Sequence, residues 1–158
     1  MRGTEFDELS FFRSIETSGA RALLIGRRAL VVLGLPVLTS DYDFWIAGDD
    51  IAVFNEASAA FDLIPTKSPE EARRMGRYVL ENDERVDVLV DRAVTARTGE
   101  VGEFAALWTR RRTTELADGV RVTIPTIEDL ILTKRFALRP RDVEDIRLLE
   151  ILKSDAKS

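Results

Sequence analysis

Strand-length apolar runs alternate with helical patterns along this 158-residue chain, and this alternation limits the possible folds more than any other feature. Ala22–Ile25 is short and apolar enough for a buried strand, and Asp41–Ala47 alternates in the manner of a strand. Helical patterns follow each of them at Arg28–Leu33, which Gly34 ends, and at Ile51–Phe61. The sequence therefore predicts an α+β (mixed α/β) fold, with a small mixed sheet flanked by helices.

The rest of the chain also contains strand-length apolar runs and helical patterns. Further strands are expected at Leu63–Ile64, Arg77–Leu80, Val86–Asp91, Thr113–Leu116 and Val120–Ile124, and further helices at Glu5–Thr17 and Glu103–Trp108. Asp118-Gly119 predicts a hairpin between the last two strands. A C-terminal helical pair is expected, with one helix capped by Thr126 and running to about Ala137, and another from Pro140 to about Leu152, before a frayed end. We expect a single domain over residues 1–158, with a core at 20–125 and the C-terminal helices at 126–152.

The composition excludes several kinds of chemistry. The chain contains no cysteine and no histidine, so disulfides, thiolate metal sites and Ser-His-Asp triads are impossible. Any bound metal must sit on carboxylates, which favours a hard ion such as magnesium. No apolar run approaches the ~20 residues that a membrane span requires, and the acidic start MRGTEFDELSFF does not predict a secretion signal. A cytoplasmic location without membrane contact is expected.

Three aspartates form the strongest candidate site. Asp41 and Asp43 are two residues apart on an expected strand, so both carboxylates project from the same face. Asp87 interrupts an otherwise apolar strand, and on a neighbouring strand it would meet the first pair. Three acids could hold two magnesium ions, as in two-metal phosphoryl transfer. Alternatively, the Asp-x-Asp pair belongs to an ordinary turn, and Asp87 forms a salt bridge with Arg85 or faces solvent.

The segment Ile25–Ile46, IGRRALVVLGLPVLTSDYDFWI, resembles the signature of the DNA polymerase β-like nucleotidyltransferase superfamily. Gly26 matches the first glycine of its turn, and Thr39, Asp41 and Asp43 match its Thr-x-Asp-x-Asp run. Asp87 lies where the third carboxylate of that family is expected. The resemblance implies a nucleotidyltransferase fold, a magnesium site and a nucleoside triphosphate (NTP) substrate.

The block around Lys134 is similar to that of AbiEii-type nucleotidyltransferases, which are often toxins of toxin–antitoxin or phage-defence systems. It consists of Lys134, Arg139, Arg141, Asp142 and Asp145. The resemblance implies that Lys134 contacts nucleotide phosphates, that the two arginines support them or bind the acceptor, and that the aspartates orient the basic residues. On physical grounds alone, Lys134 could instead snorkel from an amphipathic helix, and the arginines could neutralise a helix end.

Arg27 departs from the family pattern, because that turn position usually carries glycine or serine. A small residue lets backbone amides approach phosphates. Arg27 could add positive charge beside the triphosphate, or it could block the phosphate cradle and leave an inactive protein.

The resulting hypothesis is transfer of a nucleoside monophosphate from an NTP to a hydroxyl, with release of pyrophosphate. Asp41 and Asp43 would hold the ions, Asp87 would activate the acceptor, Gly26 would admit the phosphates and Lys134 would neutralise developing charge. The acceptor could be RNA such as a tRNA end, a protein or a small molecule, and a cognate antitoxin is a possible partner; an RNA acceptor predicts salt-dependent binding through Arg110–Arg112. The alternative is a catalytically degenerate binding module with this fold. A sugar-nucleotide glycosyltransferase is disfavoured by the short chain and the early glycine turn.

Overall fold

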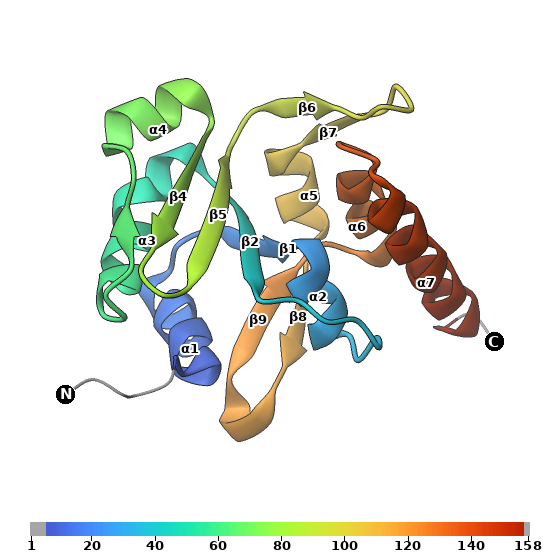
Figure 1. Cartoon of the computed structure of the whole chain (residues 1–158), viewed down its shortest axis with the longest axis horizontal. Helices are drawn as coiled ribbons and strands as arrows, with labels where there is room; N and C mark the ends of the chain where they lie inside the picture. The colour runs from blue at the N-terminus through green and yellow to red at the C-terminus, as the bar shows by residue number, and fades with distance from the viewer. Residues whose placement is uncertain (1–5, 157–158) are drawn as a thin grey trace.

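A mixed five-stranded sheet forms the centre of the computed structural model, which describes residues 6–156 (Figure 1). Its strands are β1 (Ala22–Ile25), β2 (Asp41–Ile46), β3 (Ile64–Pro65), β4 (Arg77–Glu81) and β5 (Arg85–Val90), in the order β1-β2-β5-β4-β3. Only β2 and β5 pair in parallel in this sheet, and the other three pairings are antiparallel. The predicted fold class is therefore confirmed.

Helices and two hairpins surround this sheet. The helices are α1 (Glu8–Ser18), α2 (Gly26–Val32), α3 (Ile51–Ala59), α4 (Pro69–Met75), α5 (Phe104–Arg110), α6 (Ile127–Lys134) and α7 (Pro140–Ala156). The hairpins pair β6 (Ala93–Thr95) with β7 (Val101–Glu103) and β8 (Arg112–Glu115) with β9 (Arg121–Ile124). In Figure 1, α1, α3 and α4 lie on one side of the molecule, and α6 and α7 lie on the other.

Local capping fixes where several helices begin. The Asp7 carboxylate accepts a hydrogen bond from the Ser10 backbone amide at the start of α1. The Thr126 hydroxyl accepts one from the Asp129 amide, which confirms the predicted cap of α6. Each cap satisfies an amide that has no partner within its helix.

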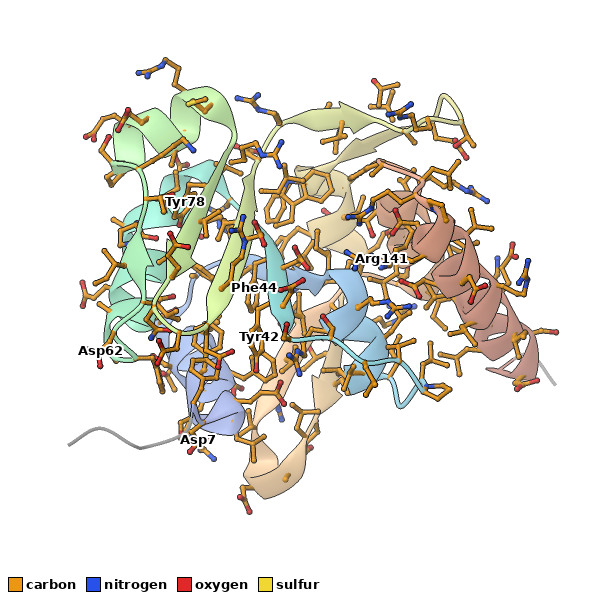
Figure 2. The ribbon with its side chains drawn as sticks, in the orientation of Figure 1. Asp7, Tyr42, Phe44, Asp62, Tyr78 and Arg141 are labelled. Atoms are coloured by element: carbon orange, nitrogen blue, oxygen red, sulfur yellow. The ribbon has the colours of Figure 1, made fainter. Side chains whose placement is uncertain are left out.

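Strand β2 divides the core into two hydrophobic clusters, because its side chains alternate between the two faces of the sheet. Tyr42, Phe44 and Ile46 are buried in the larger cluster with residues of α1 and α3, and Tyr42 and Phe44 are labelled in Figure 2. Trp45 is buried on the opposite face in the smaller cluster, with Phe104 of α5. Both large aromatic residues at positions 44 and 45 are therefore in the core, and neither is available to stack on a base.

The structure also corrects several expected boundaries. Helix α4 and the β6–β7 hairpin were not expected, because α4 buries only Ala72 and so has no apolar periodicity. Helix α6 ends at Lys134 rather than near Ala137, and the connection to α7 includes Leu138 at a φ of 49°. Helix α7 continues to Ala156 rather than fraying after Leu152. The expected helix start at Glu5 lies outside the described residues, and α1 begins at Glu8.

The larger cluster predicts where the fold is most sensitive. Phe11 is fully buried, and its ring lies 5.7 Å from that of Tyr42 and 6.0 Å from that of Phe44. We expect Phe11→Ala to lower the free energy of unfolding by about 3–5 kcal/mol, the usual cost of a large cavity. Leu38→Ala, at a side chain that is 89% exposed, should change it by less than about 0.5 kcal/mol. Urea denaturation of both variants would measure the difference, and equal effects would contradict this view of the core.

Candidate active site

Parallel pairing of β2 with β5 brings the predicted aspartates together. Asp43 is directly opposite Asp87 in the register, and Asp41 is opposite Arg85. Asp41 and Asp43 lie on the sheet face that does not carry Tyr42 and Phe44. All three aspartates line a cleft of about 510 Å³, whose other wall comes from α6 and the connection to α7. Acids from two strands that are far apart in the sequence thus share one cleft.

Gly26 supports this arrangement through direct contact with Asp43. Its φ is +70°, a region that favours glycine, and a Cβ at this position would lie 2.5 Å from the Asp43 Oδ2 atom. Helix α2 therefore starts against the Asp43 carboxylate, and only glycine leaves room for that side chain. The atoms closest to an added Cβ at Gly26 are those of the Asp43 side chain.

Burial and repulsion both act on the ionisation of Asp43. Burial raises its pKa to about 6, with further contributions from the negative charges of Asp87 and Asp41. The positive charges of Lys134 and Arg139 act in the opposite direction. A carboxylate in this state gains from any cation that enters the cleft.

Asp87 is held by an arginine of its own strand. The Arg85 guanidinium donates two hydrogen bonds of 3.1 Å, one to each carboxylate oxygen of Asp87. This is the salt bridge that the sequence left open as one alternative for Asp87. Within residues 6–156, no three acidic side chains are grouped closely enough to form a ready-made metal site.

Lys134 is the centre of a buried ionic cluster. Its side chain is 5% exposed, and its Nζ atom lies 2.8 Å from Asp145 Oδ2 and 3.8 Å from Asp142 Oδ1. The interpretation of Lys134 as a solvent-facing, snorkelling lysine is therefore wrong. Both aspartates are almost fully buried, and although burial alone would raise the pKa of each, hydrogen bonds from their basic partners lower it.

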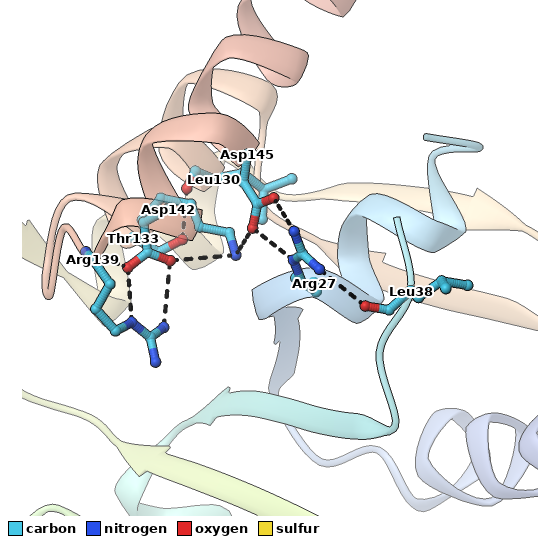
Figure 3. Close-up of polar contacts among 8 residues, drawn as sticks. Arg27, Leu38, Leu130, Thr133, Arg139, Asp142 and Asp145 are labelled. Atoms are coloured by element: carbon cyan, nitrogen blue, oxygen red, sulfur yellow. Dashed lines mark hydrogen bonds and ion pairs between the residues drawn. The ribbon is translucent and has the colours of Figure 1, made fainter. Parts of the chain in front are cut away.

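Arg27 belongs to the same cluster and bridges three segments of the chain (Figure 3). It donates hydrogen bonds of 3.2 and 3.1 Å to the two carboxylate oxygens of Asp145, and one of 3.1 Å to the backbone carbonyl of Leu38. The guanidinium thus lies against α7 and the loop before β2, while the side chain still lines the cleft.

Arg139 and Arg141 have different surroundings. The Arg139 guanidinium donates to both carboxylate oxygens of Asp142, at 2.9 and 3.3 Å. Arg141, labelled in Figure 2, also lines the cleft and is exposed like Arg139, but no ion pair is found for it among the described residues. Arg141 is therefore the more accessible of the two cations for a bound anion.

Two site residues were not identified from the sequence. Arg77, at the start of β4, lines the cleft, although nothing distinguishes it from other surface arginines before β4 is paired with β5. Arg28 donates hydrogen bonds to the backbone carbonyls of Asp41 and Thr39, at 3.3 and 3.1 Å, and so holds the entry to β2. The chain therefore uses both arginines after Gly26 to fix the segment around Asp41.

The basic run Arg110–Arg112 lies outside this cleft. Arg110 forms an ion pair of 2.9 Å with Asp129, which neutralises its charge. The Arg111 guanidinium lies 4.2 Å from the centre of the Trp108 ring. Neither side chain lines the cleft that holds the aspartates.

Comparison with solved structures shows that the chain has a nucleotidyltransferase fold. The structure superimposes on a protein described as "a putative nucleotidyltransferase from Thermotoga maritima", with a TM-score of 0.57 and 14% identity, over 92% of this chain and 89% of that one. It also superimposes on the antibiotic-resistance factor ANT(2'')-Ia, with a TM-score of 0.62 and 14% identity, over 94% of this chain and 88% of that one. No protein-family model and no curated protein sequence matches the chain. Among the described residues, no helix is both long and apolar enough to cross a membrane.

The contact between Gly26 and Asp43 yields a direct test. Gly26→Ala should destabilise the protein more than Gly34→Ala, by about 1–3 kcal/mol, because its new methyl group collides with Asp43. Gly34 is the matched control, since it also has a positive φ of 86° but has nothing within 4 Å of the place that an added methyl group would occupy. Chemical denaturation of the two variants measures the difference. Equal destabilisation would mean that only backbone strain matters at Gly26.

The raised pKa of Asp43 predicts a specific pH dependence. The folded protein binds a proton at Asp43 more tightly than the unfolded chain does, so this group makes folding less stable as the pH rises from about 4 to about 6. The free energy of unfolding of Asp43→Asn, relative to that of the wild type, should therefore increase by about 2 kcal/mol or less when the pH is raised from about 4 to about 7.5. Denaturation at both pH values measures this change. A variant that becomes relatively less stable as the pH rises would contradict the assignment.

Proposed function

We propose that this protein transfers a nucleoside monophosphate from an NTP to an acceptor hydroxyl and releases pyrophosphate. The observation that carries the proposal is the pairing of Asp43 with Asp87 across parallel strands, beside a glycine turn that opens a helix. The nucleotidyltransferase fold of the two similar structures supports the same general activity.

The donor set of the cleft suits magnesium. Asp41, Asp43 and Asp87 offer only carboxylate oxygens, which are hard ligands, and burial, with the negative charges of Asp87 and Asp41, raises the pKa of Asp43, so a cation beside it would stabilise its charged form. We assign Asp41 and Asp43 as ligands of both ions and Asp87 as a ligand on the acceptor side. Bound magnesium would lower the pKa of the attacking hydroxyl and offset charge on the phosphates.

The protein side of the transfer follows from the positions of the charged groups. The acceptor oxygen forms a bond to the α-phosphorus, the bond from that phosphorus to the bridging oxygen breaks, and pyrophosphate leaves. The hydroxyl proton passes to the Asp87 carboxylate. Arg141 and Arg139 contact the departing phosphates from the α6–α7 side of the cleft, while Lys134 supplies a fixed positive charge behind them.

The proposal extends to the acceptor of the nucleoside monophosphate and to the biological role of the protein. The block from Lys134 to Asp145 supports an AbiEii-type enzyme, which would act as a toxin or phage-defence component with an antitoxin partner. Under that proposal the acceptor is a hydroxyl on RNA, such as a tRNA end, or on a protein, and the enzyme works in the cytoplasm.

A second candidate function is a nucleotide-binding module without turnover. Two observations favour it: Asp87 is engaged by Arg85, and Lys134 is buried and paired with two aspartates. In this case the cleft would bind a nucleotide but would not activate an acceptor.

Transfer of label from each NTP, with magnesium and a total extract of RNA and protein, tests the proposal. We expect labelled acceptor with the wild type and at least about a hundredfold loss in the Asp41→Asn, Asp43→Asn double variant, the usual size of a lost electrostatic contribution. Asn keeps the size of the side chain and removes its charge. Lys134→Ala is unsuitable as a control, because removing one partner of a buried ion pair costs about 3–5 kcal/mol of stability.

The outcomes separate the two candidate functions. Label on RNA or on protein, absent with the double variant, would establish the transferase and its acceptor class. Metal-dependent nucleotide binding without label transfer would favour the binding module. Failure of the wild type to bind any NTP would contradict both.

A further inference from the structure

A second cavity adjoins the cleft at Asp43 and Asp87. It has a volume of about 340 Å³ and lies over β4, β5 and the end of α4. Asp43 and Asp87 line both this cavity and the main cleft. Its lining residues come from the sheet and the α4 region and not from α6 or α7, so a molecule in it would reach Asp87 beside β4 and β5.

Cationic side chains outnumber acidic ones in the lining of this cavity. Lys67, Arg77 and Arg85 line it, together with apolar surface from Met75 and Val79. Among the ion pairs of residues 6–156, neither Lys67 nor Arg77 takes part. Glu81, opposite Arg85 in the register, is an exposed acid on the adjacent strand and does not line the cavity. A ligand with negative charge matches these walls.

Arg85 forms an ion pair with Asp87 in this structure, with 3.1 Å between a guanidinium nitrogen and a carboxylate oxygen. Both side chains are partly exposed, so the pair is screened by water and its energy is small. A cation bound at Asp87 would compete with Arg85 for the same oxygens. Arg85 would then be available to a different anion in the cavity that it already lines.

We propose that the cavity over β4 and β5 receives an acceptor with a phosphate group beside its reacting hydroxyl, and that Arg85 exchanges Asp87 for that phosphate when a metal ion binds. The proposal rests on the proposed function and narrows its acceptor to a ribose-phosphate compound. Lys67 and Arg77 give the cavity positive charge whether or not a metal ion is bound. Arg85 adds its positive charge only when the metal ion has displaced it from Asp87. Metal and acceptor should consequently bind with positive coupling.

Calorimetric titration with the diribonucleotide ApA tests both parts. In one titration of the full chain, Mn²⁺ is present and α,β-methylene-ATP, an NTP analogue, fills the nucleotide site. In a second titration, both Mn²⁺ and the NTP analogue are left out. We expect Lys67→Gln and Arg85→Gln each to weaken ApA binding about two- to fivefold with metal present, as for a lost exposed ion pair. Arg121→Gln, which removes an exposed cation of β9 outside both cavities, should have no effect. Without metal, Arg85→Gln should no longer differ from the wild type.

The binding results test the acceptor site, the exchange of Arg85 and the proposed transferase separately. Equal ApA affinity in the wild type, Lys67→Gln and Arg121→Gln would overturn the acceptor site, as would a wild type that does not bind ApA. Loss of affinity in Lys67→Gln but not in Arg85→Gln would overturn the exchange and leave the site. Displacement of ApA by ribose 5-phosphate would identify a free sugar phosphate rather than a strand end as the source. If Lys67→Gln weakens binding while Mn²⁺ binds equally to the wild type and to the Asp41→Asn, Asp43→Asn variant, the proposed transferase fails and the anion site stands.

Discussion

The parallel pairing of β2 with β5 is the constraint on which the candidate site depends. It joins two strands that are separated in sequence by α3, β3, α4 and β4, and it sets Asp43 opposite Asp87. The buried valines and aromatic residues on the other face of these strands fix that register, because a shift by one residue would put carboxylates into the hydrophobic core. Core packing on one face thus determines the positions of the acids on the other.

The ionic cluster around Lys134 has a complementary role on the other wall of the cleft. Asp145 pairs with both Lys134 and Arg27, so it connects α7 to α6 and to the start of α2. Such a buried pair is costly to form and more costly to break on one side. The cluster therefore fixes the wall that faces the aspartates, whatever part of its charge reaches a ligand. It also explains how a bulky residue is accommodated after Gly26, because Asp145 draws the guanidinium toward α7.

The sequence predicted most of the fold and the placement of the acids on neighbouring strands, for identifiable reasons. Asp41–Ala47 and Val86–Asp91 have clear strand signals, and a cap residue such as Thr126 acts within one turn, so these elements could be located without tertiary information. The pairing of Arg85 with Asp87 was one of three open alternatives for Asp87, since residues two apart on a strand always share a face. The contacts of Arg27 and Lys134 with Asp145 could not be predicted, because they depend on how α7 packs. Helix α4 was missed because it buries too little apolar surface to produce a pattern.

The alternation of β2 between an apolar face and an acidic face also has an evolutionary consequence. Tyr42, Phe44 and Ile46 are buried with the larger cluster, whereas Asp41 and Asp43 take no part in either hydrophobic cluster. Loss of either carboxylate would therefore remove the proposed chemistry and leave the shape of the protein intact. Descendants of such a chain could keep this architecture long after losing catalysis, and could then be recruited to recognise nucleotides or partners instead. For any chain with this fold, the identities of the residues at these two positions say more about its current activity than its backbone does.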